Sequence, residues 1–412
     1  MTAVSIDPER LWQSLMELAR IGATDKGGVR RLALTSLDGA ARDLFTRWCR
    51  QAGCSIAIDG IGNIFARRSG RDNALPPIVT GSHIDTQPSG GKFDGNYGVM
   101  SGLEVIRTLN DHKIETQAPI EVVVWTNEEG SRFTPVMMGS GVFAGAFPLE
   151  STLQRADLEG ITVSQALNQI GYAGTEQTGS RPVGAYFEAH IEQGPILEDT
   201  RVVIGVVVGA LGLRWYDITV CGEDAHAGPT PMRLRKDALL AAAKMVAEIN
   251  ALAYRHQPDG RGTVGFMQVK PNSRNVIPGE VRFSVDLRHA QDATLDRMQS
   301  EMQTACERLA QEANVSLKIE CVANYPACQF DRECVGAVRD AAQRLGLSHM
   351  DIVSGAGHDA IYLARVAATG MIFVPCERGI SHNEVENAKP EDLAAGCNVL
   401  LNVILEKAGV AD

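Results

Sequence analysis

Residues 78–98 contain side chains of the types that bind divalent metal ions. The segment reads IVTGSHIDTQPSGGKFDGNYG, so a run of apolar and β-branched residues leads to His83 and Asp85, and Asp94 follows in a glycine-rich loop. Where a buried strand opens into such a loop, imidazole and carboxylate groups can come together as ligands of a zinc-class ion. The same residues can instead solvate an ordinary surface turn, so the metal interpretation depends on the rest of the chain.

Three more apolar segments, each typical of a buried strand, are followed by metal-type side chains. These are Glu128 and Glu129 after residues 120–126, His190 after residues 184–189, and His382 after residues 371–375. In a parallel sheet the carboxyl ends of the strands meet at one edge, where α/β proteins place their sites. An isolated histidine is more often structural, but this convergence favours a zinc-class site with an aspartate able to bridge two ions.

Glu128 and Glu129 are adjacent acids at the end of an apolar strand. Two such carboxylates repel each other unless a cation or a proton shares the site. One of them can bind metal while the other takes a proton from water. The alternative is a helix N-terminus, which also favours acidic residues. Asp85, two residues after His83, suits a carboxylate that orients a ligating imidazole.

The elements that would position these residues alternate between strands and helices. The pattern predicts helices at residues 8–22, 37–51, 99–109, 333–345 and after Pro390, and strands at residues 55–58, 63–67, 120–126, 184–189, 351–354 and 371–375. Residues 139–179 are less regular. Strands that alternate with helices are typical of an open α/β sheet, so we expect a fold of the α/β class.

The pattern changes from about residue 213. Strands are expected at residues 214–221, 263–269, 280–287 and 316–323, with helices at residues 236–254 and 292–313. This βαββαβ order is that of a ferredoxin-like split unit. We therefore expect a discontinuous metal-binding domain, residues 1–212 and 327–412, interrupted by an inserted domain, residues 213–326. Glycines within residues 205–212 and the pair Tyr325 and Pro326 are the expected hinges.

Length, charge and cysteine content exclude several classes of function. A chain of 412 residues exceeds the size of a single core, so two domains are expected. The formal net charge of -11 argues against a nucleic-acid partner, because phosphate binding needs a basic face. Neither a signal peptide nor an apolar run of membrane-spanning length is present, so we expect a cytoplasmic protein without a membrane partner. The nine cysteines, an odd number without a Cys-x-x-Cys pair, are expected to be free thiols.

Eight motifs together resemble those of a known family. They are GSHIDT, GGKFDGNYG, TNEEGSRF, EAHIEQGP, HAGPTPM, NVIPGEVRFSVDLRH, GAGHDA and GISHNE, and they run from residue 81 to residue 384. They resemble the dinuclear metal amidohydrolases that include N-carbamoyl-L-amino-acid hydrolase, β-ureidopropionase and allantoate amidohydrolase, with aminoacylases and di-zinc carboxypeptidases as wider relatives. The resemblance implies a di-zinc-peptidase-like catalytic domain with a central mixed sheet, and an inserted ferredoxin-like α+β dimerisation, or lid, domain.

The resemblance also implies a metal site of defined composition. His83 and His190 would hold one ion, Glu129 and His382 the other, and Asp94 would bridge the two. Glu128 would be the general base, with Asp85 behind His83. Two divalent ions per subunit are therefore expected. Zn²⁺ fits this mixture of ligands best, and Mn²⁺, Co²⁺ and Ni²⁺ also accept it.

Other motif positions would bind the substrate. The residues implied are Gln193, His226, Asn275, Arg288, Gly357 and His358. Asn275 and Arg288 would receive a substrate carboxylate, His226 would stabilise the developing oxyanion and so take part in catalysis, and Gly357 and His358 would line the same pocket. In such relatives the smaller domain forms the dimer contact and lends residues to the partner's site, so a homodimer is implied.

Arg288 has independent support from strand periodicity. In residues 280–288 the apolar side chains alternate with polar ones, which leaves Arg288 on the polar face of the expected strand. A guanidinium there could make a bidentate pair with a carboxylate. Without the family match, an ordinary solvated strand face is the simpler interpretation. For His226, the interpretation as an ordinary loop histidine in a glycine- and proline-rich turn is as good as a functional one.

The sequence thus predicts a metal-dependent amidohydrolase. It would cleave the carbamoyl amide of N-carbamoyl-L-amino acids, or of N-carbamoyl-β-alanine, to give the amino acid, carbon dioxide and ammonia. The alternative is allantoate amidohydrolase, but Leu213 stands where the resemblance implies a polar glutamine in allantoate-hydrolysing relatives. Aminoacylase or peptidase activity fits the surroundings of the ligands less well. A non-catalytic binding protein would be expected to lose a ligand or Glu128, and this chain keeps all of them.

Overall fold

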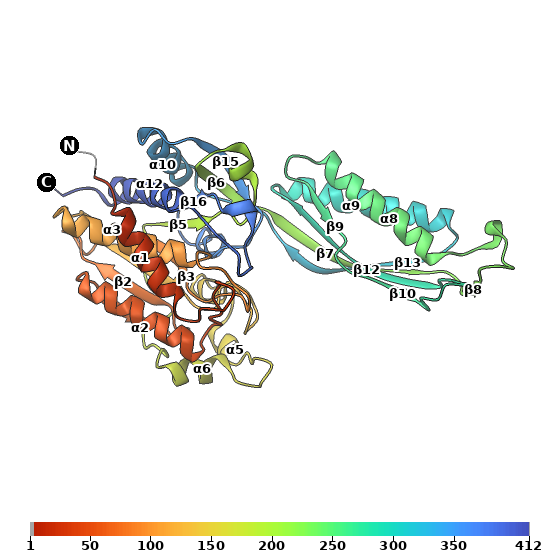
Figure 1. The fold of residues 1–412 in the computed structure, drawn as a ribbon, viewed down its shortest axis with the longest axis horizontal. Helices are drawn as coiled ribbons and strands as arrows, with labels where there is room; N and C mark the ends of the chain where they lie inside the picture. Colours follow the sequence, from red (N-terminus) through yellow and green to blue (C-terminus); the bar gives the residue numbers. More distant parts are fainter. Residues whose placement is uncertain (1–3, 412) are drawn as a thin grey trace. The chain divides into compact units, whose positions relative to one another are not determined.

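The computed structural model describes residues 4–411 and divides the chain into two compact units. The larger unit comprises Met1–Val208 and Gln329–Asp412, and the smaller unit is Gly209–Cys328. Figure 1 traces the chain through both. The expected boundaries at residues 212/213 and 326/327 lie slightly inside those of the structure, because the strands that leave and re-enter the larger unit are longer than the sequence pattern indicates.

A nine-stranded mixed sheet forms the centre of the larger unit, as the family resemblance implied. Its order is β1-β2-β4-β3-β5-β16-β6-β14, with β15 paired to β6. The bounds are Ser55–Ile58 (β1), Ile64–Arg68 (β2), Ile78–His83 (β3), Ile120–Trp125 (β4), Ala185–Ile191 (β5), Ile204–Ala210 (β6), Cys328–Gln329 (β14), His349–Ser354 (β15) and Thr369–Val374 (β16). The four adjacent strands β4, β3, β5 and β16 are parallel and fully buried. They therefore present their carboxyl ends at one edge.

Helices pack against this sheet and against one another. Their bounds are Pro8–Ala19 (α1), Ser36–Gln51 (α2), Asn96–Asp111 (α3), Met138–Phe143 (α4), Leu149–Leu153 (α5), Val163–Ile170 (α6), Ile196–Thr200 (α7), Arg332–Arg344 (α10), Asp359–Leu363 (α11) and Pro390–Ala408 (α12). The helices α1, α3 and α12 lie side by side (Figure 1). The side chain of Asp7 accepts hydrogen bonds from the first turn of α1, which explains where that helix begins.

Several local predictions differ from the structure. Helix α1 ends at Ala19 rather than near Gly22, and the irregular residues 139–179 contain the short helices α4, α5 and α6. His190 lies inside β5 rather than after it. Gly205, an expected hinge, lies within β6 and pairs with Phe373 of β16. The boundary between the two units falls at Val208/Gly209, within the range of the expected hinge, so Gly205 itself lies inside the larger unit.

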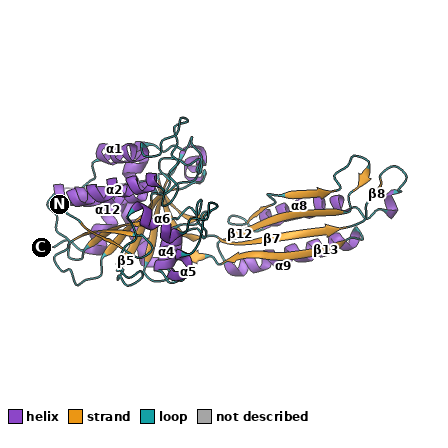
Figure 2. Ribbon diagram, turned by 90° about the horizontal axis from the view of Figure 1, so that it is seen from below, coloured by secondary structure: helices purple, strands orange, loops and turns teal. Residues whose placement is uncertain are grey.

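The smaller unit is an antiparallel sheet covered by two helices. The sheet order is β10-β12-β7-β13, with β9 also paired to β12. The bounds are Gly212–Cys221 (β7), Ala225–His226 (β8), Arg261–Thr263 (β9), Met267–Lys270 (β10), Val276–Ile277 (β11), Glu280–His289 (β12) and Ser316–Tyr325 (β13), with Ala238–Arg255 (α8) and Asp292–Glu312 (α9). Figure 2 shows α8 and α9 along these long strands. This order is the ferredoxin-like one.

Alternation along β12 explains how this sheet holds its helices. Val281, Phe283, Val285 and Leu287 are buried in the core beneath α8 and α9, while the residues between them are more exposed. The strand expected at residues 263–269 is divided into β9 and β10, because the pairing with β12 shifts by one residue between Thr263, opposite Asp286, and Met267, opposite Phe283. All nine cysteines are free thiols, as expected. Among the described residues, none of the helices combines the length and the apolar character that crossing a membrane requires.

Candidate metal centre

The expected ligands meet at the carboxyl edge of the four parallel strands. His83 ends β3, Glu128 and Glu129 follow β4, His190 lies near the end of β5, and His382 follows β16. Asp94 lies in the loop between β3 and α3. Segments that are far apart in the sequence therefore deliver one imidazole or carboxylate each to a common site. The convergence expected from a parallel sheet is present.

Asp94 lies between two ligand groups and gives one carboxylate oxygen to each. Its Oδ1 lies 3.3 Å from His190 Nε2 and 3.7 Å from His83 Nε2. Its Oδ2 lies 3.3 Å from His382 Nε2, which is itself 3.4 Å from Glu129 Oε2. Among the described residues, the potential ligand atoms form three groups. Two of them share Asp94, one with His83 and His190 and one with Glu129 and His382, and the third comprises Glu188, His190 and His358. An aspartate in this position suits a bridge between two ions.

The orientation of the two buried imidazoles fits metal binding. Nδ1 of His83 lies 2.9 Å from the Asp85 carbonyl oxygen, and Nδ1 of His190 lies 2.8 Å from the Ile191 carbonyl oxygen. Because a carbonyl only accepts, each Nδ1 must carry hydrogen, and a neutral ring then turns the lone pair of Nε2 toward Asp94. Nε2 of His190 accepts a hydrogen bond from the Gly95 N–H at 3.1 Å, and a lone pair that faces a carboxylate repels it unless a proton or a metal ion lies between them. The donor set and its orientation therefore fit a divalent metal ion.

The buried carboxylates of the site also favour a bound cation. Burial raises the pKa of Glu128 well above its usual value, and the neighbouring carboxylates Asp359, Glu129, Asp85 and Asp94 raise it further. Burial lowers the pKa of His83 to about 4. Burial alone would also lower the pKa of His190, but its contact with Asp94 outweighs this and raises that pKa to about 9. Divalent ions would supply the positive charge that these buried carboxylates otherwise take from protons.

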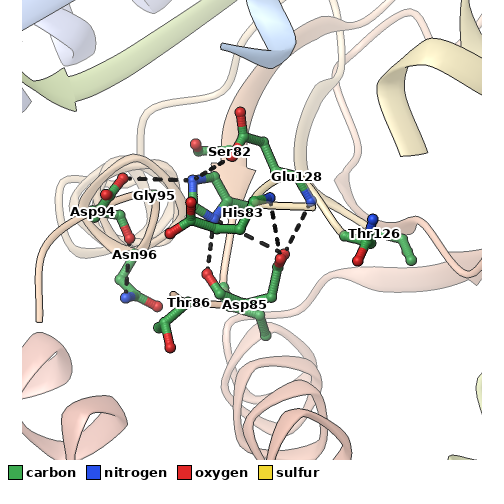
Figure 3. A network of polar contacts seen from close by, with 12 residues as sticks. Ser82, His83, Asp85, Thr86, Asp94, Gly95, Asn96, Thr126 and Glu128 are labelled. Atoms are coloured by element: carbon green, nitrogen blue, oxygen red, sulfur yellow. Dashed lines mark hydrogen bonds and ion pairs between the residues drawn. The ribbon is translucent and has the colours of Figure 1, made fainter. Parts of the chain in front are cut away.

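Asp85 does not orient His83 in the way that the sequence suggested. Its carboxylate Oδ1 lies 3.9 Å from His83 Nδ1, and the closer contact is made by its main-chain carbonyl. The carboxylate instead accepts a hydrogen bond from the main-chain N–H group of Glu128, at 3.2 Å (Figure 3). It accepts another from the main-chain N–H group of Glu129, at 3.3 Å. Two aligned N–H donors attract the carboxylate more strongly than one imidazole does. Asp85 therefore fixes the turn that carries both glutamates.

Glu128 faces the ligand group of His83. Its Oε2 lies 3.5 Å from His83 Nε2, and its side chain is buried next to the shared aspartate (Figure 3). The preceding Asn127 has a left-handed backbone, with φ of 53°, which turns the chain sharply after β4. A buried carboxylate with raised pKa at the edge of the ligand set can act as a general base.

Sequence reasoning missed several residues that hold the ligands. Gln87 donates to Glu129 from both its main-chain N–H, at 3.1 Å, and its side chain, at 2.7 Å. Asn96 donates to the Asp94 carbonyl oxygen, and the buried Arg31 donates to the Asn96 side chain. Nothing in the sequence marks Arg31, and only closeness to His83 and Asp94 in the sequence marks Gln87 and Asn96. Gln87 could have been found from its place in HIDTQP, four residues after His83.

The expected substrate residues of the larger unit lie at different depths. Gln193 donates to Asp94 Oδ2 at 2.9 Å, so it contacts the bridging carboxylate. Among the described residues, Gln193 Oε1 is buried and has no hydrogen-bond partner. Gly357 is exposed. His358 is buried, with its ring centroid 4.6 Å from that of His190 and its Nε2 2.9 Å from Ser354 Oγ, so it lies behind a metal ligand.

The other three expected substrate residues, His226, Asn275 and Arg288, belong to the smaller unit and do not all lie together. His226 pairs with Val276, and the N–H of Ala227 donates to the Asn275 carbonyl, so His226 and Asn275 lie together. Arg288 lies toward the opposite end of β12, beside Leu213, and its side chain pairs with Asp286. Eight residues of extended strand separate Glu280 from Arg288, which corresponds to about 26 Å. Within one smaller unit, Arg288 does not meet the other two residues.

Gly95 leaves the space that the His83 ring occupies in the candidate site. It has a φ of +66°, and a Cβ atom at this position would overlap His83 Nε2 and the adjacent ring carbons. We expect Gly95→Ala to weaken metal binding to the His83 and His190 group by about 100-fold, comparable to the largest effects of residues that orient ligands. Metal bound per chain after equilibration with a chelator buffer measures this.

Gly53→Ala is the matched control for that substitution. Gly53 also has a positive φ, +83°, but nothing lies within 4 Å of the added Cβ. It should lower the melting temperature slightly through backbone strain and leave the bound metal unchanged. Equal metal content in both variants would show that the contact with His83 Nε2 does not limit ligation.

This chain is similar to known proteins over most of its length. Residues 79–406 match the model of peptidase family M20/M25/M40. The chain is 47% identical over 407 residues to N-carbamoyl-L-amino-acid amidohydrolase of Rhizobium meliloti, covering 99% of this chain and 98% of that protein. It is 33% identical over 393 residues to allantoate amidohydrolase of Bacillus subtilis, covering 95% of both.

A solved structure shows the same similarity in three dimensions. The crystal structure of an amidase of the hydantoinase/carbamoylase family from Burkholderia multivorans is 58% identical in sequence and superposes with a TM-score of 0.97. The match covers 98% of each chain. The similarity therefore extends over both units of this chain.

Proposed function

We propose that this chain, which belongs to peptidase family M20/M25/M40 and to the hydantoinase/carbamoylase amidases, hydrolyses N-carbamoyl-L-amino acids with two divalent ions. One observation of the structure carries the metal-dependent hydrolysis. Asp94 lies between two sets of ligand atoms, with the buried carboxylate of Glu128 beside them. The choice of carbamoyl substrates rests on the names of the most similar relatives. Zn²⁺ is the ion that we propose first, because two imidazoles and a carboxylate suit it.

The chemistry follows from the positions of these groups. Two divalent ions, held by His83 with His190 and by Glu129 with His382, would polarise the carbamoyl oxygen and lower the pKa of the attacking water. Glu128 takes the proton of that water and returns it to the amino-acid nitrogen as its bond to the carbamoyl carbon breaks. The carbamic acid released decomposes to carbon dioxide and ammonia, so the reaction consumes one water molecule and leaves no redox change.

Substrate binding would use the remaining residues in the roles that the family resemblance implies. Arg288 and Asn275 receive the carboxylate of the amino acid, and His226 stabilises negative charge on the carbamoyl oxygen. Gln193, Gly357 and His358 border the site in the larger unit. Holding a substrate by its distant carboxylate converts binding energy into orientation at the reacting carbon.

We also propose that the active form is a homodimer. His226 and Asn275 lie at one end of β12 and Arg288 toward the other, about 26 Å away along the strand. A substrate as small as a carbamoyl amino acid cannot span that distance. Contribution of the two sets by different copies of the smaller unit would bring them to one substrate.

Allantoate hydrolysis is the second candidate, and the surroundings of Arg288 argue against it. Leu213 pairs directly with Arg288 across the strands β7 and β12. Directly paired residues of an antiparallel sheet have neighbouring side chains on one face. An apolar side chain beside the carboxylate-binding residue suits the side chain of an amino acid better than the second ureido group of allantoate.

A substrate panel tests this proposal. Purified protein loaded with Zn²⁺ or Mn²⁺ is incubated with N-carbamoyl-L-amino acids, N-carbamoyl-β-alanine and allantoate, and ammonia is measured. We expect kcat/KM for at least one N-carbamoyl-L-amino acid to exceed that for allantoate by about 10-fold or more, since a mismatched group next to a binding residue costs at least this factor. Faster release of ammonia from allantoate would reverse the order of the two candidates.

A further inference from the structure

Glu386 is a buried carboxylate between the two loops that carry the metal ligands, and the chemistry above does not use it. Its exposed fraction is 3%. We propose that Glu386 is a positioning residue that fixes His382 relative to Asp94 and so sets the affinity of the ion on the His382 side. The inference rests on the proposed metal-dependent function and deepens it.

One oxygen of Glu386 holds the loop of the bridging aspartate. Oε1 accepts hydrogen bonds from the main-chain N–H groups of Phe93, at 2.9 Å, and Asp94, at 3.1 Å. Two donors on one oxygen fix the main chain at the point where Asp94 leaves it. The position of the Asp94 carboxylate therefore depends on a side chain that is 292 residues away in the sequence.

The other oxygen holds the loop of His382. Oε2 accepts a hydrogen bond from Ser381 Oγ at 2.8 Å, and the same hydroxyl lies 3.0 Å from Asp94 Oδ2. Ser381 directly precedes His382 in the chain. Because a hydroxyl has one proton, Ser381 shares it between the two carboxylates, which ties both loops to one hydrogen-bond network.

His382 needs such support more than the other histidine ligands do. Its side chain is 52% exposed, whereas the side chains of His83 and His190 are 2% and 1% exposed. Its backbone is left-handed, with φ of 53°, which is unfavourable for a residue with a side chain. With little packing around the ring, the position of His382 depends on the main chain beside it, and Glu386 holds that main chain through Ser381.

A carboxylate is the group that this position requires. Three donors point at Glu386, from Phe93, Asp94 and Ser381. A glutamine could keep its one oxygen for the N–H groups of Phe93 and Asp94, and its N–H₂ group would then donate to Ser381 Oγ. The Ser381 proton would be left to Asp94 Oδ2 alone, which weakens that oxygen as a ligand on the His382 side. The Glu386 carboxyl group also packs closely against Gly91, where an added Cβ atom would overlap it.

The test is the metal affinity of Glu386→Gln. Metal-free protein is titrated with Zn²⁺ by calorimetry, and the wild type is expected to give two binding steps. In Glu386→Gln, the affinity of the step that His382→Ala abolishes should fall by about 10- to 100-fold, as for other residues that orient ligands. The step that His83→Ala abolishes should change less than about threefold.

Glu384→Gln is the control on the same loop, since Glu384 pairs with Lys26 at the surface, at 3.5 Å. It should leave both binding steps unchanged. Unchanged affinities in Glu386→Gln, or an equal fall in both steps together with a lower melting temperature, would overturn the positioning role. A wild-type protein that binds no Zn²⁺, Mn²⁺ or Co²⁺ would instead contradict the proposed function, so the two failures can be told apart.

Discussion

Glu128→Gln is expected to lower kcat by about 10²- to 10⁴-fold while both ions stay bound, because it removes the group that carries the proton and leaves every ligand in place. The amide has nearly the shape of the carboxylate, so the turn at Asn127 and the hydrogen bond from the Glu128 N–H to Asp85 persist. Turnover of an N-carbamoyl-L-amino acid, with metal content measured on the same sample, gives the result. KM should change much less than kcat.

Glu192→Gln serves as the control for that variant. Glu192 is also a buried glutamate at the end of a sheet strand, but its carboxylate accepts from the N–H groups of Ile196 and Leu197 at the start of α7. Its replacement should cost some stability and leave kcat within about threefold, because the residue lies outside the proton path. If Glu128→Gln retained most of the turnover with both ions bound, another group would have to be the base.

Much of the site followed from the sequence because one physical rule connected distant segments. Apolar runs before Glu128, His190 and His382 indicated buried strands, and parallel buried strands must present their ends at one edge. The two-residue alternation in β12 likewise predicted its buried face. In these cases the burial pattern is repeated over several residues, so the prediction stays correct even when a strand boundary is misplaced by one or two positions.

What could not be predicted depends on single hydrogen bonds between distant loops. The carboxylate of Asp85 binds the turn after β4 rather than His83, since two N–H donors lie within its reach. Gln87 and Glu386 hold ligands without belonging to any periodic pattern. Gly205 looked like a hinge because glycine is common at hinges, yet it lies within the sheet, where a Cβ atom would approach Phe373 closely. These contacts cannot be predicted from the local amino-acid composition.

Removing the shared carboxylate should have a different signature from removing any one histidine. Asp94 gives Oδ1 to the group of His83 and His190 and Oδ2 to the group of His382 and Glu129. Asp94→Ala is therefore expected to lower the binding affinity for both ions, each by about 100-fold or more. His83→Ala and His382→Ala should each lower the affinity for one ion strongly and for the other slightly. Without both ions, kcat should fall by about 10³-fold or more.

Metal analysis distinguishes these outcomes before any activity is measured. Each variant is freed of metal, titrated with Zn²⁺ and compared with the wild type at the same pH, since the ligands bind protons as well as metal. Melting temperatures of the metal-free proteins check the fold. Asp94→Ala should melt at a lower temperature than wild type in that state, because it removes the carboxylate that pairs with His190 and accepts hydrogen bonds from Gln193 and Ser381. If Asp94→Ala lost only one ion, Asp94 would belong to one ligand set, and the two-ion site would need another bridging group.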